Sequence, residues 1–116
     1  MKKSFIFFAI TVTVVVACSK NVSSSSDTFT EDCSTSKSWA TDVEPIIQTY
    51  CATNSGCHGS GSTNGPGALL TYTEVYNTRA AIRSAVADGS MPKDGTLSNT
   101  QKNVILCWID NGASNN

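Results

Sequence analysis

The stretch Cys51-Ala52-Thr53-Asn54-Ser55-Gly56-Cys57-His58 brings two cysteines together with the only histidine of the 116-residue chain. His58 follows the second cysteine directly, so the imidazole is fixed relative to that thiol. Five residues separate the two cysteines, and Asn54-Ser55-Gly56 within this gap is typical of a turn. We therefore expect the gap to bulge outward while the two sulfur atoms stay close together.

A cysteine followed by a Cys-His pair is the arrangement of a c-type haem attachment site, whose usual spacing is Cys-x-x-Cys-His. In such a site two thiols add to the vinyl groups of the haem, and the imidazole binds the iron as proximal ligand. Met91 is the only methionine besides Met1, and a His/Met pair ligates iron in many electron-transfer cytochromes c. The residues predict one haem c held by Cys51, Cys57, His58 and Met91. The alternative is a surface histidine and a methionine that fills a gap in the core.

Residues 1–18 combine a basic start, a short apolar run and a final cysteine. The apolar run from Phe5 to Val16 is too short for a comfortable membrane span and is typical of a signal peptide. Val15-Val16-Ala17-Cys18 resembles the bacterial lipoprotein signal, in which a small residue precedes the cysteine that is lipidated. We expect residues 1–17 to be removed and Cys18 to carry a lipid anchor. The alternative is an ordinary signal peptide with an incidental cysteine.

Export would place the domain in an oxidising compartment, where disulfides form and persist. If Cys18 carries lipid and Cys51 and Cys57 bind haem, two cysteines are left over. We therefore predict a disulfide between Cys33 and Cys107.

The charge of the chain argues against a nucleic-acid ligand. Removal of Lys2 and Lys3 lowers the eight basic residues to six, against nine acidic residues. The mature chain then has a net charge of about −3, which is not basic enough for nucleic acid. The partners we expect are redox proteins of the cell envelope and membrane lipid.

Residues 18–38 are rich in Ser, Thr, Asn and Asp. This composition offers too little apolar surface to fold, so we predict a flexible tether between the lipid and the domain. The folded domain is expected over residues 39–116, which is small for a self-sufficient core. A haem would supply an apolar centre for such a domain, and a disulfide would add a staple.

Capping-box patterns, in which Ser or Thr precedes Glu or Gln by three residues, mark three helix starts. Thr41-x-x-Glu44 opens a helix that leads to the first cysteine, and Thr71-x-x-Glu74 opens a short second helix. A further helix is expected from Thr78 to Asp88, and Ser98-x-x-Gln101 opens the last one. The apolar periodicity predicts an all-α domain of about three main helices, with no strand.

These patterns resemble the small mono-haem cytochrome c domains of many bacterial lipoproteins, which are related in fold to class I cytochromes c. The matching segments are Val43-Glu44-Pro45-Ile46-Ile47, Cys51 to Gly59, Leu70-Thr71-Tyr72, Met91-Pro92, Leu97-Ser98 and Cys107-Trp108-Ile109-Asp110-Asn111-Gly112-Ala113. The resemblance implies haem attachment at Cys51 and Cys57, with His58 as proximal and Met91 as distal ligand. It also implies that the carbonyl of Pro66, in Gly65-Pro66, orients the proximal histidine.

The sequence thus predicts a lipid-anchored carrier of single electrons, not an enzyme. We expect it in the cell envelope, on the periplasmic side of the inner membrane or on the outer membrane. Other interpretations stay open. One is a disulfide-stapled binding or structural lipoprotein without haem, with Cys51–Cys57 and Cys33–Cys107 as bridges. The others are a zinc site of Cys51, Cys57 and His58, and a Cys57/His58 nucleophile pair.

Overall fold

The computed structural model describes residues 28–116, so the predictions for the signal peptide and for Cys18 lie outside the described residues. This part of the chain forms a π-helical turn, η1 (Trp39–Val43), and three α-helices: α1 (Glu44–Tyr50), α2 (Tyr72–Ala87) and α3 (Asn99–Asp110). Residues 28–116 contain no strand, which confirms the prediction of an all-α domain over residues 39–116. None of the helices described here has the length and apolarity needed to span a membrane.

The first helical segment begins earlier than predicted. Ser38 Oγ accepts a hydrogen bond from the N–H of Thr41 at 3.2 Å, and the Ser38 N–H donates to Asp42 Oδ2 at 2.8 Å. The Val43 N–H bonds to the Ser38 carbonyl five residues back, so the first turn is π-helical before α1 continues the chain. The prediction that Thr41 caps this helix is therefore wrong, because Ser38 occupies the capping position.

One continuous helix, α2, replaces the two shorter helices expected between residues 71 and 88. It starts at the predicted capping box, in which Thr71 and Glu74 exchange both reciprocal hydrogen bonds. Val75, Ile82 and Val86 recur on one buried face of this helix. Packing of that face explains why the helix runs on through the expected break.

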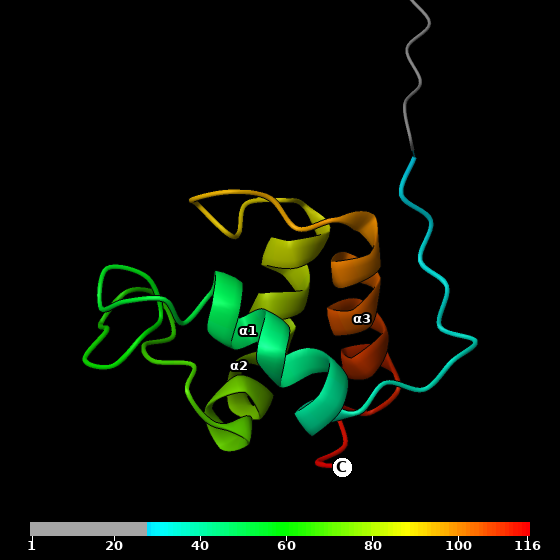
Figure 1. Ribbon diagram of the computed structural model, residues 1–116, viewed down its shortest axis with the longest axis horizontal. Helices are drawn as coiled ribbons and strands as arrows, with labels where there is room; N and C mark the ends of the chain where they lie inside the picture. Colours follow the sequence, from blue (N-terminus) through cyan, green and yellow to red (C-terminus); the bar gives the residue numbers. More distant parts are fainter. Residues whose placement is uncertain (1–27) are drawn as a thin grey trace, which may run out of the picture.

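Helix α3 starts at its predicted capping box, Ser98-x-x-Gln101, with both reciprocal bonds present. It packs against α2 and against η1 (Figure 1). Three aromatic rings meet where these elements join: ring centroids are 5.4 Å apart for Trp39 and Trp108 and 5.7 Å apart for Trp39 and Tyr72. The buried core consists of Trp39, Val43, Ile47, Leu69, Val75, Ile82, Val86, Leu97, Ile105, Leu106, Trp108 and Ala113.

Residues 28–38 run alongside α3 (Figure 1) and are fastened to it by side chains. The Asp32 N–H donates to Asn103 Oδ1 at 2.7 Å, and Asn103 Nδ2 donates to the Asp32 carbonyl at 2.8 Å. Cys33 and Cys107, the cysteines for which the sequence predicted a disulfide, are joined by one. The segment predicted as a tether thus ends in eleven residues, 28–38, that contact the domain.

Candidate functional site

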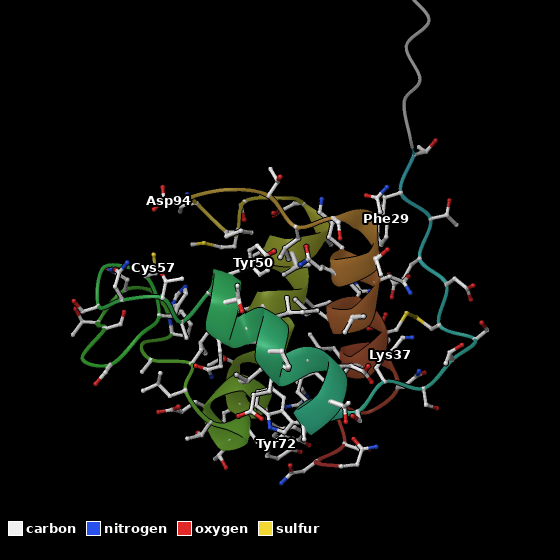
Figure 2. All side chains as sticks on the ribbon, in the orientation of Figure 1. Phe29, Lys37, Tyr50, Cys57, Tyr72 and Asp94 are labelled. Atoms are coloured by element: carbon white, nitrogen blue, oxygen red, sulfur yellow. A yellow bond between two sulfur atoms is a disulfide. The ribbon has the colours of Figure 1, made fainter. Side chains whose placement is uncertain are left out.

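A cavity of about 600 Å³ lies between the end of α1, the loop of residues 51–70, α2 and the loop that follows α2. Part of the cavity wall is formed by the apolar core, because its lining residues Leu69, Ile82 and Val86 also belong to that core. Figure 2 labels Tyr50, Cys57 and Asp94, which line it from three different segments. All four predicted cofactor-binding residues line this cavity, namely Cys51, Cys57, His58 and Met91.

His58 is buried, with 8% of its surface exposed, and one of its ring nitrogens has a protein partner. Nδ1 lies 2.9 Å from the backbone carbonyl oxygen of Gly67. A carbonyl can only accept a hydrogen bond, so in the neutral imidazole Nδ1 carries the proton and Nε2 keeps a lone pair. This is the tautomer in which a metal-binding histidine presents Nε2 to the metal.

The carbonyl that orients His58 belongs to Gly67 and not, as the resemblance implied, to Pro66. Gly65 and Gly67 both adopt positive φ angles, 55° and 88°, and the Gly67 N–H bonds to the Asn64 carbonyl at 3.0 Å. These turns shift the chain so that the second glycine carries the acceptor. The sequence does not indicate which carbonyl reaches the imidazole.

The two cysteines flank a closed loop. Cys51 follows the last turn of α1, its N–H bonded to the Ile47 carbonyl at 2.9 Å, and its own carbonyl accepts from the His58 N–H at 3.0 Å. Both Cys51 and Cys57 are free and half-buried. Burial, with a smaller contribution from the neighbouring Cys57, raises the pKa of the Cys51 thiol to about 11. The Cys51 thiol is therefore protonated at neutral pH.

Met91 enters the cavity wall from the loop between α2 and α3. It is half-buried, and its N–H donates to the Ala85 carbonyl at 3.1 Å, which anchors the loop to the end of α2. After Pro92, the side chains of Lys93 and Asp94 are exposed and also border the cavity. The fold thus brings Met91 to the same cavity as two cysteines that lie more than thirty residues earlier in the chain.

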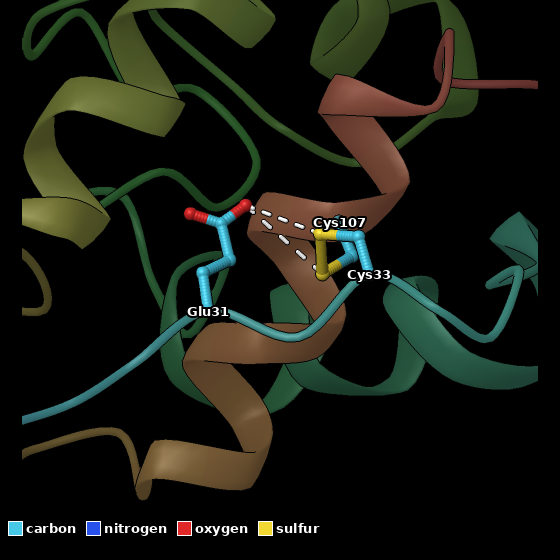
Figure 3. A group of neighbouring side chains, drawn as sticks. All are labelled: Glu31, Cys33 and Cys107. Atoms are coloured by element: carbon cyan, nitrogen blue, oxygen red, sulfur yellow. Dashed lines mark hydrogen bonds between the residues drawn. A yellow bond between two sulfur atoms is a disulfide. The ribbon is translucent and has the colours of Figure 1, made fainter.

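Metal-ligand atoms also gather at a second place, beside the disulfide. Within residues 28–116, Glu31, Cys33 and Cys107 are the group of three whose ligand atoms all lie within 4.8 Å of one another. Glu31 Oε1 is 3.3 Å from Cys33 Sγ, but both sulfur atoms are held in the disulfide and neither is a thiolate (Figure 3). Cys51, Cys57 and His58 form no such group in the described part of the chain, so the zinc interpretation has no assembled ligand set.

Comparisons with protein families, curated proteins and solved structures found no match for this chain.

Proposed function

We propose that this chain is a c-type cytochrome, anchored to a membrane by lipid on Cys18, that carries single electrons on one covalently bound haem. The observation that carries the proposal is the shared cavity of Cys51, Cys57, His58 and Met91. Its volume of about 600 Å³ lies within the roughly 300–1,000 Å³ that is usual for cofactor sites. Part of its wall is formed by the buried apolar side chains of Leu69, Ile82 and Val86, as a buried haem requires.

The donor set fits a haem residue by residue. His58 would be the proximal ligand through Nε2, because the Gly67 carbonyl holds Nδ1–H. Cys51 and Cys57 would hold the ring through thioethers, formed when each S–H adds across a vinyl double bond and nothing leaves. Met91 would be the distal ligand. The alternative of a metal-free Cys57/His58 nucleophile has less support, because no carboxylate is bonded to the His58 ring.

A bound haem supplies reversible one-electron chemistry at its iron. The chain contributes the axial ligands, the apolar wall and the hydrogen bond to the histidine, and these control the reduction potential. Thioether ligation by Met91 would raise that potential. The electron partners would be redox proteins of the cell envelope, on the periplasmic side of the inner membrane or on the outer membrane.

A second candidate is a disulfide-stapled binding or structural lipoprotein without haem. The Cys33–Cys107 disulfide favours it, because this bond fastens the arm of residues 28–38 to α3. It also requires a Cys51–Cys57 bridge, and these two cysteines are free.

Covalent attachment tests the proposal directly. The exported protein is extracted with acid–acetone, and its intact mass is measured. We expect the wild-type mass to include one haem, and Cys51→Ala/Cys57→Ala to release all of it. Cys33→Ala/Cys107→Ala is the matched control and should keep the haem. Wild-type protein that loses its haem to the solvent, or never contains one, would contradict covalent attachment.

A further inference from the structure

Asn54 organises the loop between the two cysteines. Its carbonyl oxygen accepts hydrogen bonds from the N–H groups of Cys57 at 3.1 Å and Gly59 at 2.8 Å. Its side-chain Oδ1 accepts from the N–H groups of Gly56 at 2.8 Å and Cys57 at 3.2 Å. A single exposed residue thus binds three backbone N–H groups that follow it in the chain.

The loop also closes tightly around Asn54. A Cβ atom on Gly59 would lie 2.7–2.8 Å from backbone atoms of Asn54, a distance that no real side chain tolerates. On the outer side, Asn64 Nδ2 donates to the Gly56 carbonyl at 2.7 Å, and Ser62 Oγ donates to the Cys57 carbonyl. The segment from Asn54 to Gly59 is therefore held in this conformation by several hydrogen bonds and by a close backbone contact.

This conformation matters because of the gap between the cysteines. A spacer of five residues has more conformations available than a spacer of two, and ordering it costs more entropy. An Asn side chain that bonds to the backbone two residues on removes much of that freedom. Both acceptors of Asn54 bind the N–H of Cys57, so the position of the second thiol depends on them directly.

We propose that Asn54 is a positioning residue that makes the five-residue gap compatible with two-point attachment. Its side-chain oxygen holds Cys57 and the adjoining His58 at the cavity wall, beside Cys51. The attachment part of this inference rests on the proposed haem function, whereas the ordering of the loop does not.

Three variants test the role of the side-chain oxygen. Asn54→Ala removes the acceptor, Asn54→Asp keeps an oxygen in the same place, and Ser55→Ala changes the exposed neighbour as a matched control. The first readout is amide hydrogen exchange in the purified exported protein. We expect exchange at Gly56 and Cys57 to be about tenfold faster in Asn54→Ala, and close to wild type in Asn54→Asp and Ser55→Ala.

The second readout is the number of thioether bonds. The pyridine adduct of the denatured protein distinguishes two linkages from one, because an unreacted vinyl group shifts the absorption band to longer wavelength. We expect two linkages in wild type, in Ser55→Ala and in Asn54→Asp. In Asn54→Ala we expect a several-fold loss of the doubly linked form, with the remaining haem attached at one cysteine.

Three results would overturn the proposal: unchanged exchange in Asn54→Ala, failure of Asn54→Asp to rescue, or full double linkage despite a disordered loop. The last result would reduce Asn54 to a structural residue. Wild-type protein without haem would contradict the proposed function, and the exchange rates at Gly56 and Cys57 would then decide by themselves whether Asn54 holds the loop.

Discussion

His58 Nδ1 lies 2.9 Å from the carbonyl oxygen of Gly67, and this bond determines which imidazole nitrogen is free to bind a metal. Gly67 has a φ of 88°, a conformation that glycine adopts without strain. The acceptor for the proposed proximal ligand is thus held by a glycine in a turn. A hydrogen bond of this kind raises the basicity of a metal-bound histidine.

Gly67→Ala should strain the left-handed backbone at this position and so weaken the hydrogen bond from His58. The reduction potential should then rise, because the imidazole becomes a poorer donor to the ferric iron. Gly61→Ala is the control: its φ is 78°, and its added Cβ would meet nothing within 4 Å. Both variants should lose about 1–2 kcal/mol of stability from the left-handed backbone. Redox titration should show a shift in Gly67→Ala only, and equal shifts in both would separate the potential from this hydrogen bond.

Met91 should ligate the iron and not only fill the wall. Met91→Leu removes the sulfur but keeps apolar bulk, whereas Met91→Ala removes both. We expect both variants to lose the weak near-infrared sulfur-to-iron band, to bind carbon monoxide and to have a lower potential. A packing role would leave Met91→Leu like wild type, and a wild-type spectrum without the band would favour a ligand-binding or catalytic haem.

The Cys33–Cys107 disulfide should stabilise the domain without affecting the site. It joins residues 74 positions apart, and constraint of the unfolded chain by such a loop is worth about 4 kcal/mol in the entropy model. Cys33→Ala should lower the free energy of unfolding by up to this amount in denaturant titrations, with an unchanged absorption spectrum. Labelling of both thiols by alkylation before reduction would show that the bond is absent.

The ion pair of Arg83 with Asp110 should make the free energy of unfolding depend on pH in the acid range. The Arg83 guanidinium donates to Asp110 from Nε to Oδ1 and from Nη2 to Oδ2, each at 2.6 Å, and these bonds hold the pKa of the Asp110 carboxyl below its usual value. In an unfolded chain the pKa of an Asp carboxyl is about 3.9. Because the folded pKa is depressed, this stabilisation is complete above the unfolded pKa and is lost as the pH falls through the folded pKa.

Arg83→Gln should therefore lower stability at neutral pH by about 1 kcal/mol or less, since the pair is partly exposed. The difference from wild type should shrink as the pH falls below about 3.9. Arg79→Gln is the control, because the Arg79 guanidinium lies 3.9 Å over the Tyr76 ring and not on a carboxylate. Denaturation at several pH values tests this, and a pH-independent effect of Arg83→Gln would contradict it.

Local patterns in the sequence predicted the helices better than the segments between them. The capping boxes predicted at Thr71-x-x-Glu74 and Ser98-x-x-Gln101 are confirmed, because each forms within four consecutive residues. At the first helix the acidic partner of Ser38 is Asp42, four residues on, so the interaction does not match the capping-box spacing. The expected break in α2 is absent because a buried face on α2 packs against the rest of the core.

Contacts between residues far apart in the chain could not be predicted from the sequence patterns. The bonds of Asp32 to Asn103, 71 residues apart, hold an arm whose composition indicated a flexible tether. The sequence predicted the four residues of the candidate site but not the cavity that they line. Cys51, Cys57 and His58 are close in sequence, whereas the packing of α2 brings Met91 to the same cavity. The Gly67 acceptor depended on two turns whose shape the composition does not specify.

The visible absorption spectrum of the exported and purified wild-type protein tests the central claim most directly. We expect a coloured protein whose reduced spectrum has the sharp bands of a low-spin c-type haem, at one haem per chain. The bands should stay with the protein after acid–acetone extraction. A colourless protein of unmodified polypeptide mass would contradict the account and would favour the disulfide-stapled lipoprotein without haem.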